Sequence, residues 1–171
     1  MDFKIPIPKG YRPITKIEND NLVVKFKKIS DFNKIFQLYT DGGSRGNGNE
    51  NSIAGIGGAI IYCSEVKHTF SKYLGKGITN NEAEYRALIE GLNMCLLLDF
   101  KFIKAHVDSK LVCEQVNNRW KVNNHNLSKL KKEVLELSKQ FVYFELVHVL
   151  RNDNKIADEL ANKAMDTAIF G

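Results

Sequence analysis

From residue 36 onward, runs with strand-like and helix-like apolar spacing follow one another in an order that few folds can hold. Three β-like runs come first, and helices and strands then alternate. The predicted strands are residues 36–41, 54–62, 67–74, 102–108 and 141–149, and the predicted helices begin near Thr79, Ser109, 127 and Asp153. This order is typical of a mixed α/β layer in which an antiparallel meander joins parallel strands.

Small residues mark two of these segments. The run at 54–62 is rich in glycine, which indicates close approach of another backbone or a ligand. The last helix carries an alanine stripe that includes Ala157, Ala161 and Ala164, so it can lie close against a sheet. A glycine-rich loop is predicted at 42–52, between the first two strands.

Acidic residues stand in unusual local settings along this framework. Each lies at a strand end or beside an apolar helix stripe, where an unpaired carboxylate would be costly to bury. If they converge, they form a site for divalent cations, which is the chemistry of phosphodiester cleavage. The four candidates are Asp41, Glu84, Asp108 and Asp158.

Charge is concentrated near the N-terminus. Of the net +5, residues 1–35 contribute +4, with eight Lys/Arg against four Asp/Glu, and the rest of the chain contributes +1. A polyanionic partner such as nucleic acid fits this distribution, and so does a solvated basic surface. We expect residues 1–35 to be a basic extension, for which a hairpin around Leu22–Phe26 is one form.

The remaining composition is that of an ordinary globular protein. At 171 residues, with 43% apolar and 26% charged residues, the chain can bury a sizeable core. No apolar run approaches the roughly 20 residues needed to span a bilayer, and the start lacks a signal-peptide pattern. The three cysteines, Cys63, Cys95 and Cys113, are expected to be reduced core thiols in an intracellular protein.

Four segments together resemble the successive motifs of type 1 ribonuclease H. They are Thr40–Gly48, Thr79–Leu88, Asp108-Ser109, and His148–Asn152 with Asn154 and Ala157–Ala161. The resemblance covers about residues 36–168, in family order. It implies an RNase H-like α/β fold, with a mixed five-stranded sheet flanked by helices, as a catalytic domain at 36–171. It further implies an endoribonuclease that cuts the RNA strand of RNA/DNA hybrids using two Mg²⁺ ions, for which Mn²⁺ can substitute. The enzyme is expected to act as a monomer and to have no membrane partner.

The resemblance assigns Asp41, Glu84, Asp108 and Asp158 as metal ligands, with Asp41 bridging both ions. Each position also has an ordinary structural explanation. Asp41 could initiate a turn, Glu84 could favour the positive end of a helix, and Asp108 could cap the helix after it. Asp158 could pair with a lysine. Glu82, off the apolar stripe, is interpreted as solvent-facing.

His148 matches the family's histidine ahead of the last helix, which implies proton transfer or product release. It also continues the strand before it, so a structural strand-end role stays open. Arg151 stands where flexible small residues often occur in the family, and it could contact phosphate or stabilise developing charge.

Substrate contacts are assigned in outline. Asn47, Asn80 and Asn81 match family positions that contact the sugar edge in the minor groove, and an amide suits a 2′-hydroxyl. Loop and helix-cap duties are the alternative for these three residues. Trp120 could stack on the DNA strand, although packing under the helix at 127–140 is favoured. The family's basic handle is absent, and the segment 49–53 lengthens the glycine loop.

Two other classes of function stay open. One is a non-catalytic module that binds hybrids or double-stranded RNA, for which four acids would be unnecessary. The other is a related metal nuclease of retroelement type or a 3′–5′ exonuclease. Exonucleases of this superfamily usually carry an Asp-x-Glu pair on the first strand, whereas here Asp41 is followed by Gly42-Gly43.

Overall fold

The computed structural model describes residues 11–18, 21–28 and 34–170, and the chain divides into two compact units, Met1–Ile35 and Phe36–Gly171. In the first unit, β1 (Tyr11–Glu18) pairs antiparallel with β2 (Asn21–Lys28). The β-branched and apolar run in β2 is the one that indicated a strand in the sequence. The other parts of the predicted extension, residues 1–10, 19–20 and 29–33, lie outside the described residues.

The second unit is built on a mixed five-stranded sheet with the order β5-β4-β3-β6-β7. Antiparallel pairing joins β3 to β4 and β4 to β5, whereas β3–β6 and β6–β7 are parallel. This confirms the predicted combination of meander and parallel strands. The strands are β3 (Phe36–Arg45), β4 (Ile53–Tyr62), β5 (Glu65–Gly75), β6 (Phe102–Val107) and β7 (Tyr143–His148).

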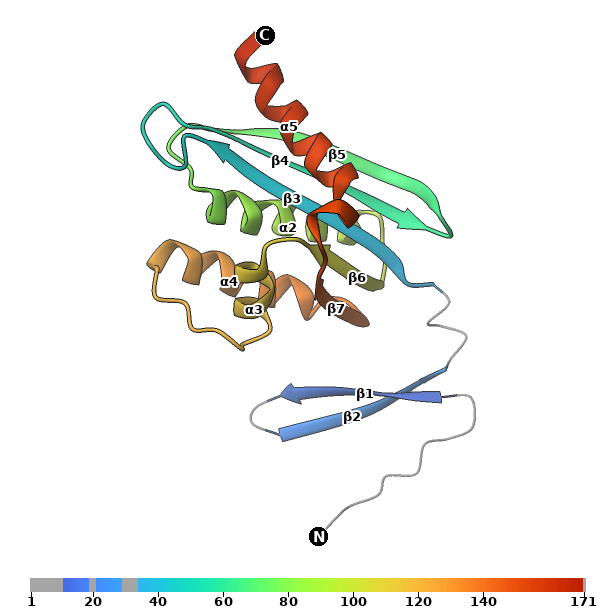
Figure 1. The fold of residues 1–171 in the computed structure, drawn as a ribbon. Coiled ribbons are helices and arrows are strands. Elements are labelled where there is room, and N and C mark those ends of the chain that lie inside the picture. The colour runs from blue at the N-terminus through green and yellow to red at the C-terminus, as the bar shows by residue number, and fades with distance from the viewer. Residues whose placement is uncertain (1–10, 19–20, 29–33, 171) are drawn as a thin grey trace. The chain divides into compact units, whose positions relative to one another are not determined.

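Helices cover both faces of this sheet, with α5 on one face and α2 on the other (Figure 1). The core lies between the sheet and α2, where Leu38, Leu88 and Ile103 are fully buried. The connection from α3 to α4 is short and holds no further helix, in keeping with the predicted absence of a handle. The helices are α2 (Asn80–Leu97), α3 (Lys110–Val116), α4 (His125–Ser138) and α5 (Lys155–Phe170), with a 3₁₀ turn η1 (Arg151–Asp153) before α5.

The first strand is longer than predicted. Gly42 and Gly43 were expected to open a loop, but they continue the ladder opposite Ile56 and Gly55 of β4, and β3 ends only at Arg45. Glycine is a weak strand former, so its pairing here depends on the neighbouring strand. The loop is therefore confined to residues 46–52.

Glycines let the helices approach the sheet closely. A Cβ on Gly57 would stand 2.3 Å from the backbone nitrogen of Ala161, which explains why α5 carries small residues where it crosses β4. On the other face, a Cβ on Gly42 would stand 2.3 Å from the carbonyl carbon of Ala83 in α2. Both contacts need the bare glycine backbone.

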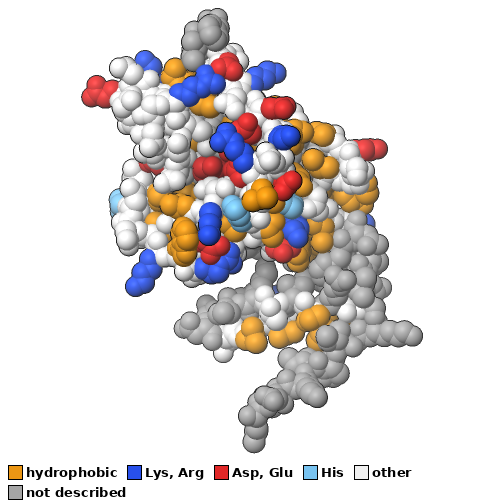
Figure 2. Space-filling model, in the orientation of Figure 1, with side chains coloured by type: hydrophobic (Ala, Val, Ile, Leu, Met, Phe, Trp, Pro, Cys, Tyr) orange, Lys and Arg blue, Asp and Glu red, His pale blue; other side chains and the backbone are white. Residues whose placement is uncertain are grey.

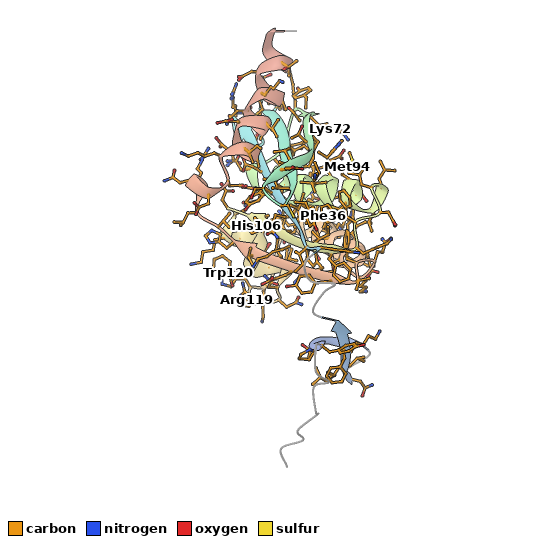
Figure 3. The ribbon with its side chains drawn as sticks, turned by 90° about the vertical axis from the view of Figure 1, so that its right-hand side faces the viewer. Phe36, Lys72, Met94, His106, Arg119 and Trp120 are labelled. Atoms are coloured by element: carbon orange, nitrogen blue, oxygen red, sulfur yellow. The ribbon has the colours of Figure 1, made fainter. Side chains whose placement is uncertain are left out.

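Two sequence interpretations are wrong. Cys63 is exposed, because it lies in the tight turn between β4 and β5 with a positive φ of 51°, whereas Cys95 and Cys113 are buried as expected. Trp120 does not pack under α4: it is 46% exposed, and the Lys110 ammonium lies 6.0 Å from its ring centroid. Figure 3 shows Trp120 beside Arg119, at the end of the second unit away from Lys72. Among the described residues, the helices are too short or too polar to cross a membrane.

Candidate active site

Three carboxylates converge where β6 ends beside the middle of its parallel neighbour β3. Thr40 of β3 is in register with Val107 of β6, so the next residues, Asp41 and Asp108, emerge side by side. Glu84 reaches the same place from the first turns of α2, which the glycine at position 42 allows to lie against β3. One carboxylate oxygen from each of Asp41, Glu84 and Asp108 lies within 4.8 Å of the other two.

This arrangement is electrostatically costly without a cation. Asp41 is 9% exposed, and its pKa is raised to about 7, mainly by burial and then by the charges of Asp108 and Asp158. Burial, followed by the charges of Asp41 and Asp108, also raises the pKa of Glu84 well above its usual range. Its Oε2 is buried without a hydrogen-bond partner. Crowded hard oxygens with an unsatisfied acceptor fit a divalent cation of the Mg²⁺ type.

Asp158 lines the same site as these three carboxylates but is paired differently. Its Oδ1 accepts a hydrogen bond of 2.6 Å from Nη2 of Arg151, and it stands outside the close group of three. The start of α5 is anchored by the buried Asn154, whose Nδ2 donates to the carbonyl oxygen of Thr40 at 3.0 Å. The predicted quartet is therefore brought together as three clustered carboxylates and a fourth held by an arginine.

The pocket has a volume of about 370 Å³. It opens between β3, α2 and α5, and acidic and basic side chains lie close together on the face over which α5 runs (Figure 2). Its lining comprises Asp41, Gly42, Gly43, Ser44, Arg45, Asn80, Glu84, Asp108, Arg151, Asp158, Asn162 and Met165.

Of the three predicted asparagines, Asn80 lines the pocket, whereas Asn47 and Asn81 lie outside its lining. Oδ1 of Asn80 accepts from the Ser44 backbone N–H at 2.6 Å, and Oδ1 of Asn47 accepts from the Asn80 backbone N–H at 3.0 Å. These bonds tie the end of β3, the following loop and the start of α2 together. Asn81 is exposed beside them. Glu82 is occupied in a capping box with Thr79 rather than directed at the pocket.

His148 lies at the exposed end of β7, outside the pocket lining. Its Nε2 is 3.2 Å from the backbone oxygen of Asp108. Because a carbonyl oxygen only accepts, Nε2 carries the proton in this contact. The histidine therefore contacts the backbone of Asp108, one of the clustered acids, and it is also the last residue of β7. The position agrees with both alternatives that the sequence left open.

Six residues of the pocket lining were not among the predicted site residues: Gly42, Gly43, Ser44, Arg45, Asn162 and Met165. Asn162 follows Asp158 by four residues and so lies one helical turn along the same side of α5. That spacing was readable in the sequence. Arg45 was hidden by the assumption that the chain left the sheet after Asp41.

Comparisons with known proteins agree with this geometry. A family model described as "Reverse transcriptase-like" matches residues 40–164. A bifunctional protein of Mycobacterium tuberculosis is 41% identical over 134 residues, covering 77% of this chain and 35% of that protein. The chain thus spans about a third of the length of these first mycobacterial relatives. Ribonuclease HI of Halobacterium salinarum is 32% identical over 162 residues, covering 87% of this chain and 77% of that enzyme.

A solved structure gives the same result. A ribonuclease H1 in complex with an RNA/DNA hybrid superposes with a TM-score of 0.72 at 34% identity, covering 78% of this chain and 99% of that one. The family model spans most of this chain, and the halobacterial enzyme is matched over more than two thirds of its length. The chain therefore belongs to the ribonuclease H family.

Proposed function

We propose that this protein is an endoribonuclease that cleaves the RNA strand of RNA/DNA hybrids by metal-dependent phosphodiester hydrolysis. The observation that carries the proposal is the cluster of Asp41, Glu84 and Asp108, with carboxylate oxygens within 4.8 Å of one another. Maintaining three such groups together, one with an unsatisfied buried oxygen, is reasonable only where a cation binds. The similarity to enzymes named ribonuclease H supports the same substrate.

Within this proposal, Asp41, Glu84, Asp108 and Asp158 hold two divalent cations, Mg²⁺ or, as a substitute, Mn²⁺. Bound in this way, the ions supply an activated water and charge stabilisation at the leaving oxygen. Asp41 would be the ligand shared by the two ions, because the charges of both Asp108 and Asp158 act on it.

The neighbouring residues bind and orient the substrate. Asn80, which lines the pocket, and its neighbours Asn47 and Asn81 are assigned to the sugar edge of the minor groove, where an amide can meet a 2′-hydroxyl. Since Nε2 of His148 is held by the Asp108 carbonyl, Nδ1 is the atom we assign to proton transfer.

Arg151 is placed to exchange its partner Asp158 for a substrate phosphate. The Arg151 and Asp158 side chains are 76% and 26% exposed, and an ion pair whose cation is open to water contributes only about 0–1 kcal/mol. A substrate phosphate can therefore draw the guanidinium away from Asp158 at little cost. We assign Arg151 to phosphate binding, with Asp158 released to hold a cation. The free thiols Cys63, Cys95 and Cys113 are consistent with an intracellular setting for this reaction.

The test is a cleavage assay on labelled RNA/DNA hybrid, duplex RNA and duplex DNA, with Mg²⁺, with Mn²⁺ and with chelator. Metal-dependent cutting confined to the RNA of the hybrid is expected. Asp41→Asn should abolish it, whereas Glu159→Gln, which removes an exposed acid next to Asp158, should not. Hybrid binding without cleavage in any metal would instead support the non-catalytic alternative.

A further inference from the structure

The end of β3 presents an arginine that no part of the mechanism above uses. Successive side chains of a strand point to opposite faces, and along β3 the α5 face receives Asp41, Gly43 and Arg45 in turn. Gly43 faces Met165 of α5, because a Cβ there would stand 3.3 Å from the Met165 methyl carbon. Arg45 reaches α5 directly: its Nη1 lies 2.6 Å from Oδ1 of Asp166, and its Nη2 lies 3.5 Å from Oδ1 of Asn162.

Helix α5 supplies a matching row. Asp158, Asn162 and Asp166 are spaced by four residues and share one side of the helix. An arginine from another element pairs with each end: Arg151 with Asp158, and Arg45 with Asp166. Both arginines line the pocket that holds the carboxylate cluster. The acidic centre is therefore flanked by a guanidinium on either side.

Arg45 is expected to contact a different phosphate from Arg151, because it lies far from Asp41 along β3. Four residues of strand place the Cα atoms of Asp41 and Arg45 about 13 Å apart, at about 3.3 Å per residue. With glycine at position 43, β3 itself places no side chain between them, and the side chain that lies over this position is Met165 of α5. A nucleic-acid strand whose reacting phosphate lies at Asp41 would thus bring a different phosphate to Arg45.

The pairing of Arg45 is easily exchanged. The Arg45 and Asp166 side chains are 43% and 52% exposed, the range in which an ion pair contributes little to stability. A guanidinium also matches a phosphate with two parallel hydrogen bonds. Resting on the proposed function, we propose that Arg45 binds a backbone phosphate of the hybrid other than the one being cleaved, exchanging Asp166 for that phosphate.

The first test compares Arg45→Ala, Arg45→Lys and Asp166→Asn with Lys72→Ala. Lys72 is a matched control, because it is also a strand cation paired with a helix acid, Glu90 at 3.1 Å, but lies outside the pocket lining. Steady-state cleavage gives KM and kcat, and hybrid affinity against salt is measured in an Asp41→Asn background. Arg45→Ala should raise KM about tenfold and change kcat little. It should also lower, by about one, the slope of the logarithm of hybrid affinity against the logarithm of salt concentration.

The partner variant makes the test two-sided. Asp166→Asn should lower KM, because it releases Arg45 for the phosphate, and Arg45→Lys should retain the salt slope but lose part of the affinity. If Arg45→Ala has the salt slope of the parent, or if Asp166→Asn raises KM as Arg45→Ala does, the pair is structural and the inference is wrong.

A second measurement locates the phosphate. Hybrids carrying one neutral methylphosphonate at successive positions are cleaved by the parent and by Arg45→Ala. At one position other than the scissile phosphate, the loss of cleavage rate caused by the methylphosphonate and the loss caused by Arg45→Ala should be less than additive, as expected for groups in contact. Additive losses at every position would overturn the inference. A parent protein that cuts no hybrid at all would instead disprove the proposed function.

Discussion

Gly42 lies directly against the backbone of Ala83, so closely that a Cβ at position 42 would stand 2.3 Å from the Ala83 carbonyl carbon and 2.6 Å from the Glu84 nitrogen. This approach joins the strand that carries Asp41 to the helix that carries Glu84. The distance between two of the clustered carboxylates therefore depends on a missing side chain.

Gly42→Ala should separate α2 from β3 and lower the free energy of unfolding by about 1–3 kcal/mol, the usual cost of overpacking. Gly43→Ala is the matched control, because its Cβ would meet only the flexible end of Met165 at 3.3 Å. Urea denaturation of both variants measures the difference. Equal stability of the two variants would show that the close approach is not required.

The carboxylate cluster predicts an unusual pH dependence for the metal-free protein. The pKa of Asp41 is raised from 3.8 to about 7 on folding, so between these values the folded state binds more protons than the unfolded state. The free energy of unfolding should fall as pH rises through this range, by about 4 kcal/mol at most. The burial of Glu84 acts in the same direction.

Mg²⁺ should reverse this loss, because it competes with protons for the same oxygens. We expect 10 mM Mg²⁺, roughly saturating for a weak site, to raise Tm more at pH 8 than at pH 5.5, and to raise it little in Asp41→Asn. The measurement is thermal unfolding followed by circular dichroism. A Tm increase of the same size at both pH values would argue against binding at these carboxylates.

His106 makes the free energy of unfolding depend on pH in the opposite direction to the carboxylate cluster. It is 8% exposed, stacks on Tyr39 with ring centroids 4.4 Å apart, and has its Nε2 2.8 Å from Oε1 of Gln37. Burial, followed by the charge of Lys104, lowers its pKa from 6.5 to about 4. As pH falls from 6.5 to 4, the unfolded chain takes up a proton first, so His106 should remove up to about 3 kcal/mol of stability.

His106→Phe should remove this contribution. The carboxylate cluster contributes equally to both proteins, so the test is the difference: the free energy of unfolding of the variant minus that of the parent, measured in urea at several pH values, should increase as pH falls from 6.5 to 4. His125→Gln, at the exposed start of α4, is the control and should follow the parent. Identical curves for the parent and His106→Phe would contradict the predicted shift.

The sequence was sufficient for the element order and for the three clustered acids. Strand ends and helix stripes are local patterns, and they singled out these acids in the sequence; the register of β3 with β6, which the structure shows, places Asp41 beside Asp108. Features that depend on long-range packing were not accessible in the same way. The pairing of Gly42 and Gly43 with β4 extends β3 to Arg45, and nothing in the local composition of that segment favours a strand.

Pairing and exposure were harder still to predict. Asp158 was expected either to bind metal or to pair with a lysine, and its partner in the structure is Arg151, seven residues earlier across a 3₁₀ turn. Cys63 has an apolar run before it, yet it occupies the turn where that run ends. Both outcomes depend on where a turn falls, which apolar periodicity locates only approximately.

The pair of Arg151 and Asp158 leads to the last prediction. Arg151→Ala should lower kcat/KM for hybrid cleavage by about tenfold to a hundredfold, since a hydrogen bond to a charged group contributes about 1.5–3 kcal/mol. Arg151→Lys should recover part of the activity, because it keeps the charge but loses the fork. Lys155→Ala, an exposed cation at the start of α5, is the matched control and should cleave like the parent. If Arg151→Ala also cleaves like the parent and with the same salt dependence, the arginine serves only to pair with Asp158, and phosphate binding at this side of the pocket must come from another group.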